Sequence, residues 1–221
     1  MAQARKRTRS ASETKALIIH EAAMLFATRG YERTSLEAIA STIGISAPAI
    51  YYHFNSKDEI LFATLENTLA QLNLMSAEGV AAAGLSPAAQ LRGFVRAHVR
   101  HDVGNADIMP MLNAGLYNVD QLIGGLPTAR RRKLVQMQRS FLDRLRDILN
   151  TGKTEGVFTF ENVTTTAFAI IGIVDFAVYW FRTEGALTVE DLADQYGDLA
   201  ARMAGAPDAQ ASMKSRTPRR R

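Results

Sequence analysis

The sequence predicts an all-α protein, and three observations point to this fold class. Nearly every segment after residue 10 spaces its apolar side chains at helical intervals, and none alternates apolar and polar residues as a strand would. Hydrophobic residues make up 47% of the 221 residues, which is enough for a sizeable core. Helix-start and helix-stop residues recur along the chain. We expect about nine helices, over residues 12–29, 35–42, 46–53, 56–80, 86–103, 106–120, 127–152, 161–183 and 188–204.

The boundaries of these helices follow from local signals. In the capping-box spacing a hydroxyl accepts from a backbone N–H and a carboxylate three residues later reaches back. It occurs in Ser10 with Glu13, Thr34 with Glu37, and Ser56 with Glu59. Two later helices start at Ser86-Pro87 and at Pro127. Glycines are expected to end four helices, at Gly30, Gly44, Gly84 and Gly152.

Connection lengths and composition suggest four parts. We expect a basic disordered arm over residues 1–10, a three-helix domain over 11–55, a larger helical domain over 56–205 and a disordered tail over 206–221. The arm carries a charge of +4 and the last eight residues +5, so the body between them is mildly acidic. Basic ends on an acidic body favour a polyanion partner such as nucleic acid, although two solvated tails would show the same charges.

Composition also excludes several classes of protein. The chain has no cysteine, which excludes disulfides, thiolate metal sites and thiol catalysis. The basic start is not followed by the apolar stretch of a secretory signal. The longest apolar run, residues 167–181, is shorter than the ~20 residues of a membrane span and is interrupted by Asp175. We therefore expect a cytoplasmic protein without a membrane partner.

The most informative segment is LEAIASTIGISAPAIYYH, residues 36–53. Its isoleucines lie where two short, steeply crossing helices would share a small core, namely Ile39, Ile43, Ile45 and Ile50. Ala40 is small where the helices approach, and Gly44 suits a turn that needs a positive φ. This pattern predicts a helix-turn-helix whose second helix begins at Ser46 and enters the major groove of DNA.

Residues 13–62 resemble the DNA-binding domain of the TetR family of transcriptional regulators. The resemblance is carried by FATRGYERTSLEAIASTIGISAPAIYYHFNSKDEILF, in which family spacings are kept by Phe26, Gly30, Tyr31, Thr34, Ile39, Ala40, Gly44, Tyr51, His53, Phe54 and Lys57. It implies a homodimeric regulator, most often a repressor, that binds a palindromic operator in double-stranded DNA. A small hydrophobic effector would release it.

The DNA contacts are expected around the second helix of this motif. By resemblance the candidates are Thr34, Ser35, Ser46, Ala47, Pro48, Ala49, Tyr51, Tyr52, His53 and Lys57. The side chains that open the recognition helix are small, so methyl contacts and DNA shape should outweigh bidentate base recognition. The tyrosines, Thr34 and Lys57 would bind phosphates. The basic arm could follow the backbone or enter the minor groove.

The last two helices are expected to form the dimer interface, because residues 161–183 are apolar around nearly the whole helix. The candidate interface residues are Ile170, Val174, Val178, Phe181, Leu192, Tyr196 and Leu199. A core helix inside one subunit would show the same composition, so both interpretations stay open.

An effector pocket is expected between the helices of the larger domain. Its candidate lining is Phe94, His98, His101, Met109, Leu112, Tyr117, Met137, Phe141, Phe168, Ile171, Asp175 and Tyr179. Methionines and aromatics at helical spacing also fit plain core, and Asp175 could be a structural carboxylate with a partner. His98, His101 and Asp102 resemble a partial metal-ligand set. Without a confirming cluster we predict no metal and no cofactor.

The segment VYWFRTEGALTVEDLA, residues 178–193, resembles a C-terminal pattern of TetR regulators that control lipid and sterol degradation. That resemblance implies an acyl-coenzyme A (acyl-CoA) effector, with an apolar tunnel for the acyl chain. Basic residues would bind the coenzyme phosphates, the candidates being Arg130, Arg131, Arg132, Lys133, Arg139 and Arg146, although each could be solvated.

Other functions remain in competition with this interpretation. The sequence has no nucleophile elbow, phosphate-binding glycine loop or paired catalytic carboxylates, so we do not expect an enzyme. A TetR-type regulator of an efflux pump would bind aromatic or cationic drugs instead of thioesters. An architectural DNA-binding protein would have no effector.

Overall fold

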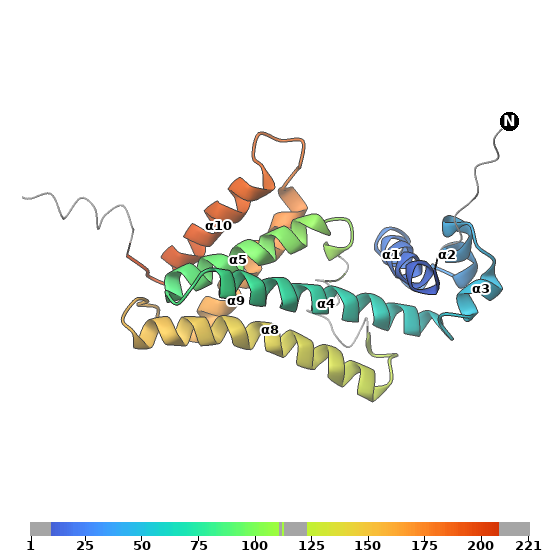
Figure 1. Ribbon diagram of the computed structural model, residues 1–221, viewed down its shortest axis with the longest axis horizontal. Helices are drawn as coiled ribbons and strands as arrows, with labels where there is room; N and C mark the ends of the chain where they lie inside the picture. Colours follow the sequence, from blue (N-terminus) through green and yellow to red (C-terminus); the bar gives the residue numbers. More distant parts are fainter. Residues whose placement is uncertain (1–9, 111, 113–122, 208–221) are drawn as a thin grey trace, which may run out of the picture. The chain divides into compact units, whose positions relative to one another are not determined.

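The structure is a computed structural model that describes residues 10–110, 112 and 123–207. The described residues form helices and contain no strand, which confirms the all-α fold class (Figure 1). Eight helices are bounded there: α1 (Ala11–Arg29), α2 (Leu36–Ile43), α3 (Ala47–Tyr51), α4 (Lys57–Ala82), α5 (Pro87–Gly104), α8 (Thr128–Thr154), α9 (Val163–Trp180) and α10 (Val189–Met203). Most of the helix expected over 106–120, the arm before Ser10 and the tail beyond Pro207 lie outside the described residues.

The chain divides into two compact units, which we describe separately. The first contains residues 1–68 and 110–132, and the second contains residues 69–109 and 133–221. The division falls inside α4 and α8, so each of these helices belongs to both units. The domain boundary expected near residue 55 stays a prediction. The two compact units divide further along the chain, inside α4.

The first unit is built on α1, α2, α3 and the start of α4. The capping box predicted at Ser10 and Glu13 is present, with each side chain bound to the other residue's backbone N–H. Ile18 and Phe26 of α1 are fully buried, as are Ile39, Ile50 and Phe54. The helix-turn-helix therefore closes its own small core against α1.

The start of α2 differs from the expectation by one residue. Ser35, not Thr34, is the N-cap and accepts from the backbone N–H of Ala38 at 3.1 Å. At the start of α4, Ser56 accepts from the backbone of Glu59 as predicted, but the Glu59 carboxylate accepts from the backbone of Asn55. Capping boxes read from spacing thus locate a helix start to within a residue.

The second unit packs α5, α9 and α10 around a common apolar core. Its largest fully buried side chains include Phe94 and Leu91 of α5 and Leu145 and Leu149 of α8. α5 runs back along the second half of α4, where Gly79 and Gly93 meet backbone to backbone (Figure 1). A Cβ on Gly79 would lie 2.5 Å from the carbonyl oxygen of Gly93, so this crossing requires glycine.

The end of α8 shows a second difference. Gly152 does not stop the helix, which continues to Thr154 and ends before Gly156 at a φ of 72°. Gly152 instead makes room for the ring of Phe158, because an added Cβ would overlap that ring. The glycine in this position serves side-chain packing.

α9 turns one apolar face into the core of the second unit and leaves the other uncovered. Ala167, Ile170, Val174 and Ala177 are buried there, together with Val178. α9 has the length and composition of a membrane-crossing helix, but its buried face belongs to this core.

This packing buries most of the residues expected at a dimer interface. Five residues predicted to pair two subunits are buried inside one chain: Ile170, Val174, Val178, Phe181 and Leu192. Tyr196 and Leu199 are half-buried. The sequence left the choice of face open because α9 is apolar on both sides.

Candidate functional site

The turn between α2 and α3 has the geometry that the sequence predicts. Gly44 adopts a left-handed conformation with a φ of 72°, and its N–H donates to the carbonyls of Ala40 and Ser41. The N–H of Ile45 donates to the carbonyl of Ala40 at 3.0 Å, which completes a Schellman motif. The carbonyls that end α2 are thereby satisfied, and the chain turns sharply into α3.

The second helix of this motif presents small and aromatic side chains to solvent. α3 begins after Ser46 and carries Pro48 in its first turn, where proline is tolerated. Ser46 and Pro48 are exposed, and Ala47 and Ala49 are half-buried. Tyr51 is 53% exposed and Tyr52 is 81% exposed. Ile50, which precedes them in the chain, is fully buried.

These tyrosines are large apolar rings that the first unit leaves in solvent. His53 is half-buried and stacks edge-to-face with Tyr52, with ring centroids 5.1 Å apart. Ser35 is exposed at the start of α2, as is Arg33, which the sequence analysis did not select. A hydroxyl, a guanidinium and two phenols are thus available to phosphate oxygens in this unit.

Thr34 is placed differently from the expectation. It is buried, and its hydroxyl donates to the carbonyl of Gly30 at 2.9 Å. That hydroxyl satisfies the backbone after α1, so the structure gives Thr34 a role in the turn and leaves Ser35 as the exposed hydroxyl.

Lys57 is also engaged inside the first unit. Its Nζ donates to the carbonyl of Tyr31 at 3.0 Å and lies 4.3 Å from the centre of the Tyr31 ring. The hydroxyl of Tyr31 donates to Asp58 on the same helix start. Burial and this hydrogen bond raise the pKa of Tyr31, so it stays a neutral donor. Lys57 therefore ties the α1–α2 connection to the start of α4.

The residues expected to line an effector pocket fall into three groups. Phe94, His98 and Phe141 meet in the core of the second unit, where the Phe141 ring centre lies 4.8 Å from Phe94 and 5.0 Å from His98. Ile171 and Met137 are half-buried, and Met109 and Leu112 are buried. Tyr117 lies outside the described residues.

Two further expected pocket residues lie on the uncovered side of α9. Phe168 and Tyr179 are each 49% exposed and share this side with Phe176 and Trp180. We call these four side chains the α9 aromatic face. Tyr196 of α10 stacks on Trp180 with ring centres 6.5 Å apart, which extends the face toward α10.

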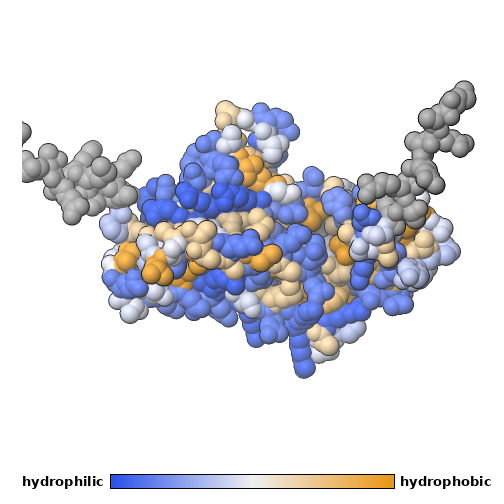
Figure 2. Space-filling model, viewed as in Figure 1, coloured by the Kyte–Doolittle hydropathy of each residue, from blue (hydrophilic) through white to orange (hydrophobic). Residues whose placement is uncertain are grey.

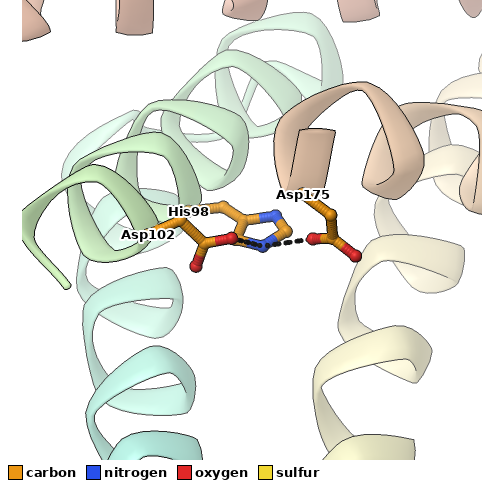
Figure 3. A group of neighbouring side chains, drawn as sticks. All are labelled: His98, Asp102 and Asp175. Carbon is orange, nitrogen blue, oxygen red and sulfur yellow. Dashed lines mark ion pairs between the residues drawn. The ribbon is translucent and has the colours of Figure 1, made fainter. Parts of the chain in front are cut away.

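A buried polar cluster joins α5 to α9 (Figure 3). The Nε2 atom of His98 lies 3.3 Å from Asp102 and 3.2 Å from Asp175. His101 holds the other oxygen of Asp102 through its Nδ1 atom at 2.9 Å. Asp175, which the sequence left in need of a partner, thus faces an imidazole.

The charges in this cluster support one another. Burial lowers the pKa of His98, but the neighbouring carboxylates of Asp102 and Asp175 outweigh burial and raise it to about 10. Burial raises the pKa of Asp102, but His98 and His101 outweigh it and lower that pKa to about 2. The core of the second unit therefore holds charged groups at neutral pH.

A row of ion pairs links α5 to α10. Three arginines one helical turn apart pair with three carboxylates: Arg92 with Asp198, Arg96 with Asp194, and Arg100 with Glu190. The same arginines line a hollow of about 310 Å³ floored by small residues of α4 and α5. The outer side of α10 is correspondingly hydrophilic (Figure 2).

The basic residues expected to bind coenzyme phosphates are distributed over both units. Arg130 pairs with Glu59 at 3.4 Å in the first unit, and Arg146 pairs with Asp143 in the second. Arg132, Lys133 and Arg139 are exposed, Arg131 is half-buried, and the unit division falls after Arg132. The arginines that are gathered in one place are those of α5.

Comparison with known proteins agrees with this architecture. The family "Tetracyclin repressor-like, C-terminal domain" matches residues 84–204, and "Bacterial regulatory proteins, tetR family" matches residues 18–64. The chain is 28% identical over 177 residues to the transcriptional repressor KstR2 of Rhodococcus jostii, which covers 79% of this chain and 83% of KstR2.

Solved structures give the same result. The TetR family regulator PfmR of Thermus thermophilus is 31% identical, with a TM-score of 0.71 over 84% of this chain and 97% of PfmR. The structure of AibR in complex with isovaleryl coenzyme A and operator DNA shares the fold, with a TM-score of 0.71, 23% identity and coverage of 85% and 97%. Because one family spans more than half of the chain and the second covers the helix-turn-helix, the protein belongs to the TetR family of transcriptional regulators, which are DNA-binding proteins and not enzymes.

Proposed function

We propose that the protein is a cytoplasmic homodimeric repressor that binds a palindromic operator through α3 and is released by an effector. The observation that carries this proposal is the Schellman turn at Gly44, because it aims an α3 with exposed small residues away from the core of the first unit. Two copies are needed because one α3 reaches only a few base pairs, and half-sites repeat every ~34–36 Å along DNA.

We assign the DNA contacts to side chains of the first unit that are exposed or half-buried. Ser46, Ala47, Pro48 and Ala49 would meet base edges, where their small size favours methyl contacts and shape readout. Phosphates would be bound by Tyr51, Tyr52, His53, Ser35 and Arg33. Thr34 and Lys57 would act indirectly by fixing the turn and the start of α4.

Selection of bound fragments from random duplexes, followed by footprinting with the full chain, tests this assignment. The expected result is a palindrome protected over two successive turns of DNA. The variant Pro48→Arg should change or abolish the selected sequence, whereas the exposed control Leu85→Arg should leave it unchanged. Binding without any sequence preference at moderate ionic strength would contradict the proposal.

For the dimer we propose the α9 aromatic face in place of the residues predicted from sequence. Its four rings are exposed and lie at successive positions of one helix side, and Tyr196 continues them. Exposed apolar patches of this kind mark protein interfaces, and aromatic rings dominate the energy of such interfaces. The proposed partner is a second copy, since a palindromic operator requires two-fold symmetry.

We propose an acyl-CoA thioester as the effector class. The 178–193 segment supports this class, as does AibR, a fold relative solved with isovaleryl coenzyme A. The arginine hollow would take the phosphates, which would compete with the α10 carboxylates for Arg92, Arg96 and Arg100. Binding would thus loosen α10 from α5.

Loosening of α10 would be transmitted to the DNA-binding unit through α4, because α4 is one continuous helix shared by both units. An effector that moves the protein from mostly bound to mostly released must prefer the released state by about 10⁴-fold. Only a ligand touching elements that differ between the two states can supply such a preference.

Calorimetric titration distinguishes the effector classes. Long-chain, sterol-derived and isovaleryl thioesters should bind and lower operator affinity, and Arg96→Gln should weaken thioester binding by about 10-fold without affecting a free fatty acid. Binding of a cationic drug without thioester binding would instead identify a regulator of the efflux type. A chain that binds its operator and responds to none of these compounds would fit the architectural alternative.

A further inference from the structure

We propose that His98, Asp102 and Asp175 form a site for a divalent transition-metal ion, with Zn²⁺ as the best fit. The three residues offer one ligand atom each, and these atoms lie within 4.8 Å of one another. The site joins α5 to α9 inside the second unit. It is independent of the DNA and effector assignments above.

Two of the three separations between ligand atoms match those around a tetrahedral ion, and the third lies within 4.8 Å. Charge-assisted N–H···O bonds are about 2.7–2.9 Å long. Two of the ion pairs between α5 arginines and α10 carboxylates have N···O distances of 2.7 Å. The two distances from His98 Nε2 are 3.3 Å and 3.2 Å. Ligand atoms at ~2.0–2.1 Å from a tetrahedral Zn²⁺ are separated by about 3.3–3.4 Å.

The direction of the groups also fits a shared ion. Figure 3 shows the imidazole of His98 between the two carboxylates, with its Nε2 atom facing both. A single proton on that nitrogen points along one line and cannot serve two acceptors well. A cation among the three groups would displace the Nε2 proton of His98 to solvent and contact all three groups at once.

The sequence spacing and the surroundings supply the remaining features of a metal site. His98 and Asp102 are four residues apart on one side of α5, so a rigid helix presents both together. His101 donates from its Nδ1 atom to the second oxygen of Asp102 at 2.9 Å, as a supporting residue around a metal ligand does. His98 and Asp102 are almost fully buried and Asp175 is 15% exposed.

The ligand types select the class of ion. An imidazole nitrogen with two carboxylates suits Zn²⁺, Mn²⁺ or Fe²⁺, whereas Ca²⁺ takes six to eight oxygens and Mg²⁺ keeps most of its water. Three protein ligands leave a coordination position open for water or for an oxygen of a bound molecule. The site would therefore brace α5 against α9 and could also hold a ligand.

The test is calorimetric titration of ZnCl₂ into the full-length chain, freed of any affinity tag and treated with chelator. We expect one Zn²⁺ per chain, no binding of MgCl₂, and a midpoint of thermal unfolding that rises with Zn²⁺. Asp175→Asn, which keeps the side-chain shape, should weaken Zn²⁺ binding by at least about 100-fold, and His101→Gln by about 10-fold. His20→Gln, which changes an exposed histidine, should have no effect.

A second measurement needs no variant at the site and so does not depend on how well a variant folds. The chain has four histidines, and ¹⁵N NMR of their rings resolves each Nε2 atom. Zn²⁺ should shift Nε2 of His98 and leave His20 and His53 unchanged. An unshifted His98, an absence of Zn²⁺ binding, or an affinity unaffected by Asp175→Asn would each overturn the proposal.

Discussion

The helix-turn-helix and α9 differ in how much of their large apolar side chains they bury. The helix-turn-helix buries Ile39 and Ile50 completely and exposes mainly small or hydroxyl-bearing residues around Ser46. α9 buries one apolar side and leaves four aromatic rings on the other in solvent. The first arrangement suits a polar, charged surface such as DNA, and the second suits a dry protein surface. The two regions thus need different partners.

The largest effect is expected on the α9 aromatic face. Phe176→Glu should raise the dimer dissociation constant by at least about 100-fold, because it places a charge in the middle of an apolar interface. Sedimentation at micromolar concentration would show single subunits, and binding to a palindrome would fall with it. The control Leu85→Glu changes an even more exposed apolar residue outside α9 and should leave the dimer intact.

A dimer that survives Phe176→Glu would mean that α9 is not the pairing element. The comparison between the helix-turn-helix and α9 would then no longer hold, because α9 would not need a second copy as its partner. The unfolding free energy of Phe176→Glu should stay within ~0.5 kcal/mol of wild type when measured on subunits, since the ring is 62% exposed.

The next effect is expected in the core of the helix-turn-helix. Ile50→Ala should lower the free energy of unfolding of the first unit by about 2–5 kcal/mol, because it empties a fully buried site. Ile45→Ala is the matched control, and its half-buried side chain should cost less. Urea denaturation followed by circular dichroism measures both. Equal losses would show that the motif does not close a core of its own.

Two glycines should respond with opposite sign. Gly44→Ala should destabilise the protein by about 1–2 kcal/mol, because a Cβ is strained at a φ of 72°. Gly172→Ala lies inside α9 with open space around it in the single chain, so in separate subunits carrying Phe176→Glu it should stabilise the helix by up to about 1 kcal/mol. Thermal unfolding separates the two. Destabilisation by Gly172→Ala without Phe176→Glu would indicate that a partner approaches α9 there.

The smallest effect is expected from single phenol groups at the DNA surface. Tyr51→Phe should weaken operator binding about fivefold at every sequence, as one lost phosphate hydrogen bond would. Tyr31→Phe is the control, because that hydroxyl donates to Asp58 inside the first unit. Gel-shift titration at fixed salt measures the change. A Tyr51→Phe variant with altered sequence preference would instead place the ring at a base.

Features fixed by neighbouring residues could be predicted from the sequence. The capping box at Ser10 and the turn at Gly44 depend on a few adjacent positions, and both are present. Thr34 and Gly152 misled the prediction because their environment comes from distant residues. The hydroxyl of Thr34 donates to the carbonyl of Gly30 after α1, and Gly152 leaves space for the ring of Phe158.

Long-range relationships were the part that the sequence could not supply. His98 and Asp102 were noticed as neighbours on one helix, but Asp175 joins them from α9 only in the folded second unit. Phe168 and Tyr179 fit a pocket as well as a surface, because α9 is apolar on both sides and periodicity cannot tell which side faces inward.

The arginine row on α5 has a property that its charges alone do not reveal. Its arginines and the carboxylates of α10 both repeat every four residues, so sliding α10 by four residues, about 6 Å, would re-form two of the three pairs. The ion pairs alone therefore fix neither the direction nor the register of α10. The register is therefore selected by packing along the seam, where an added Cβ on Gly197 would touch the backbone of Arg92 at 3.4 Å. The ion pairs hold α10 on α5 but leave it able to shift along its own axis in steps of one turn.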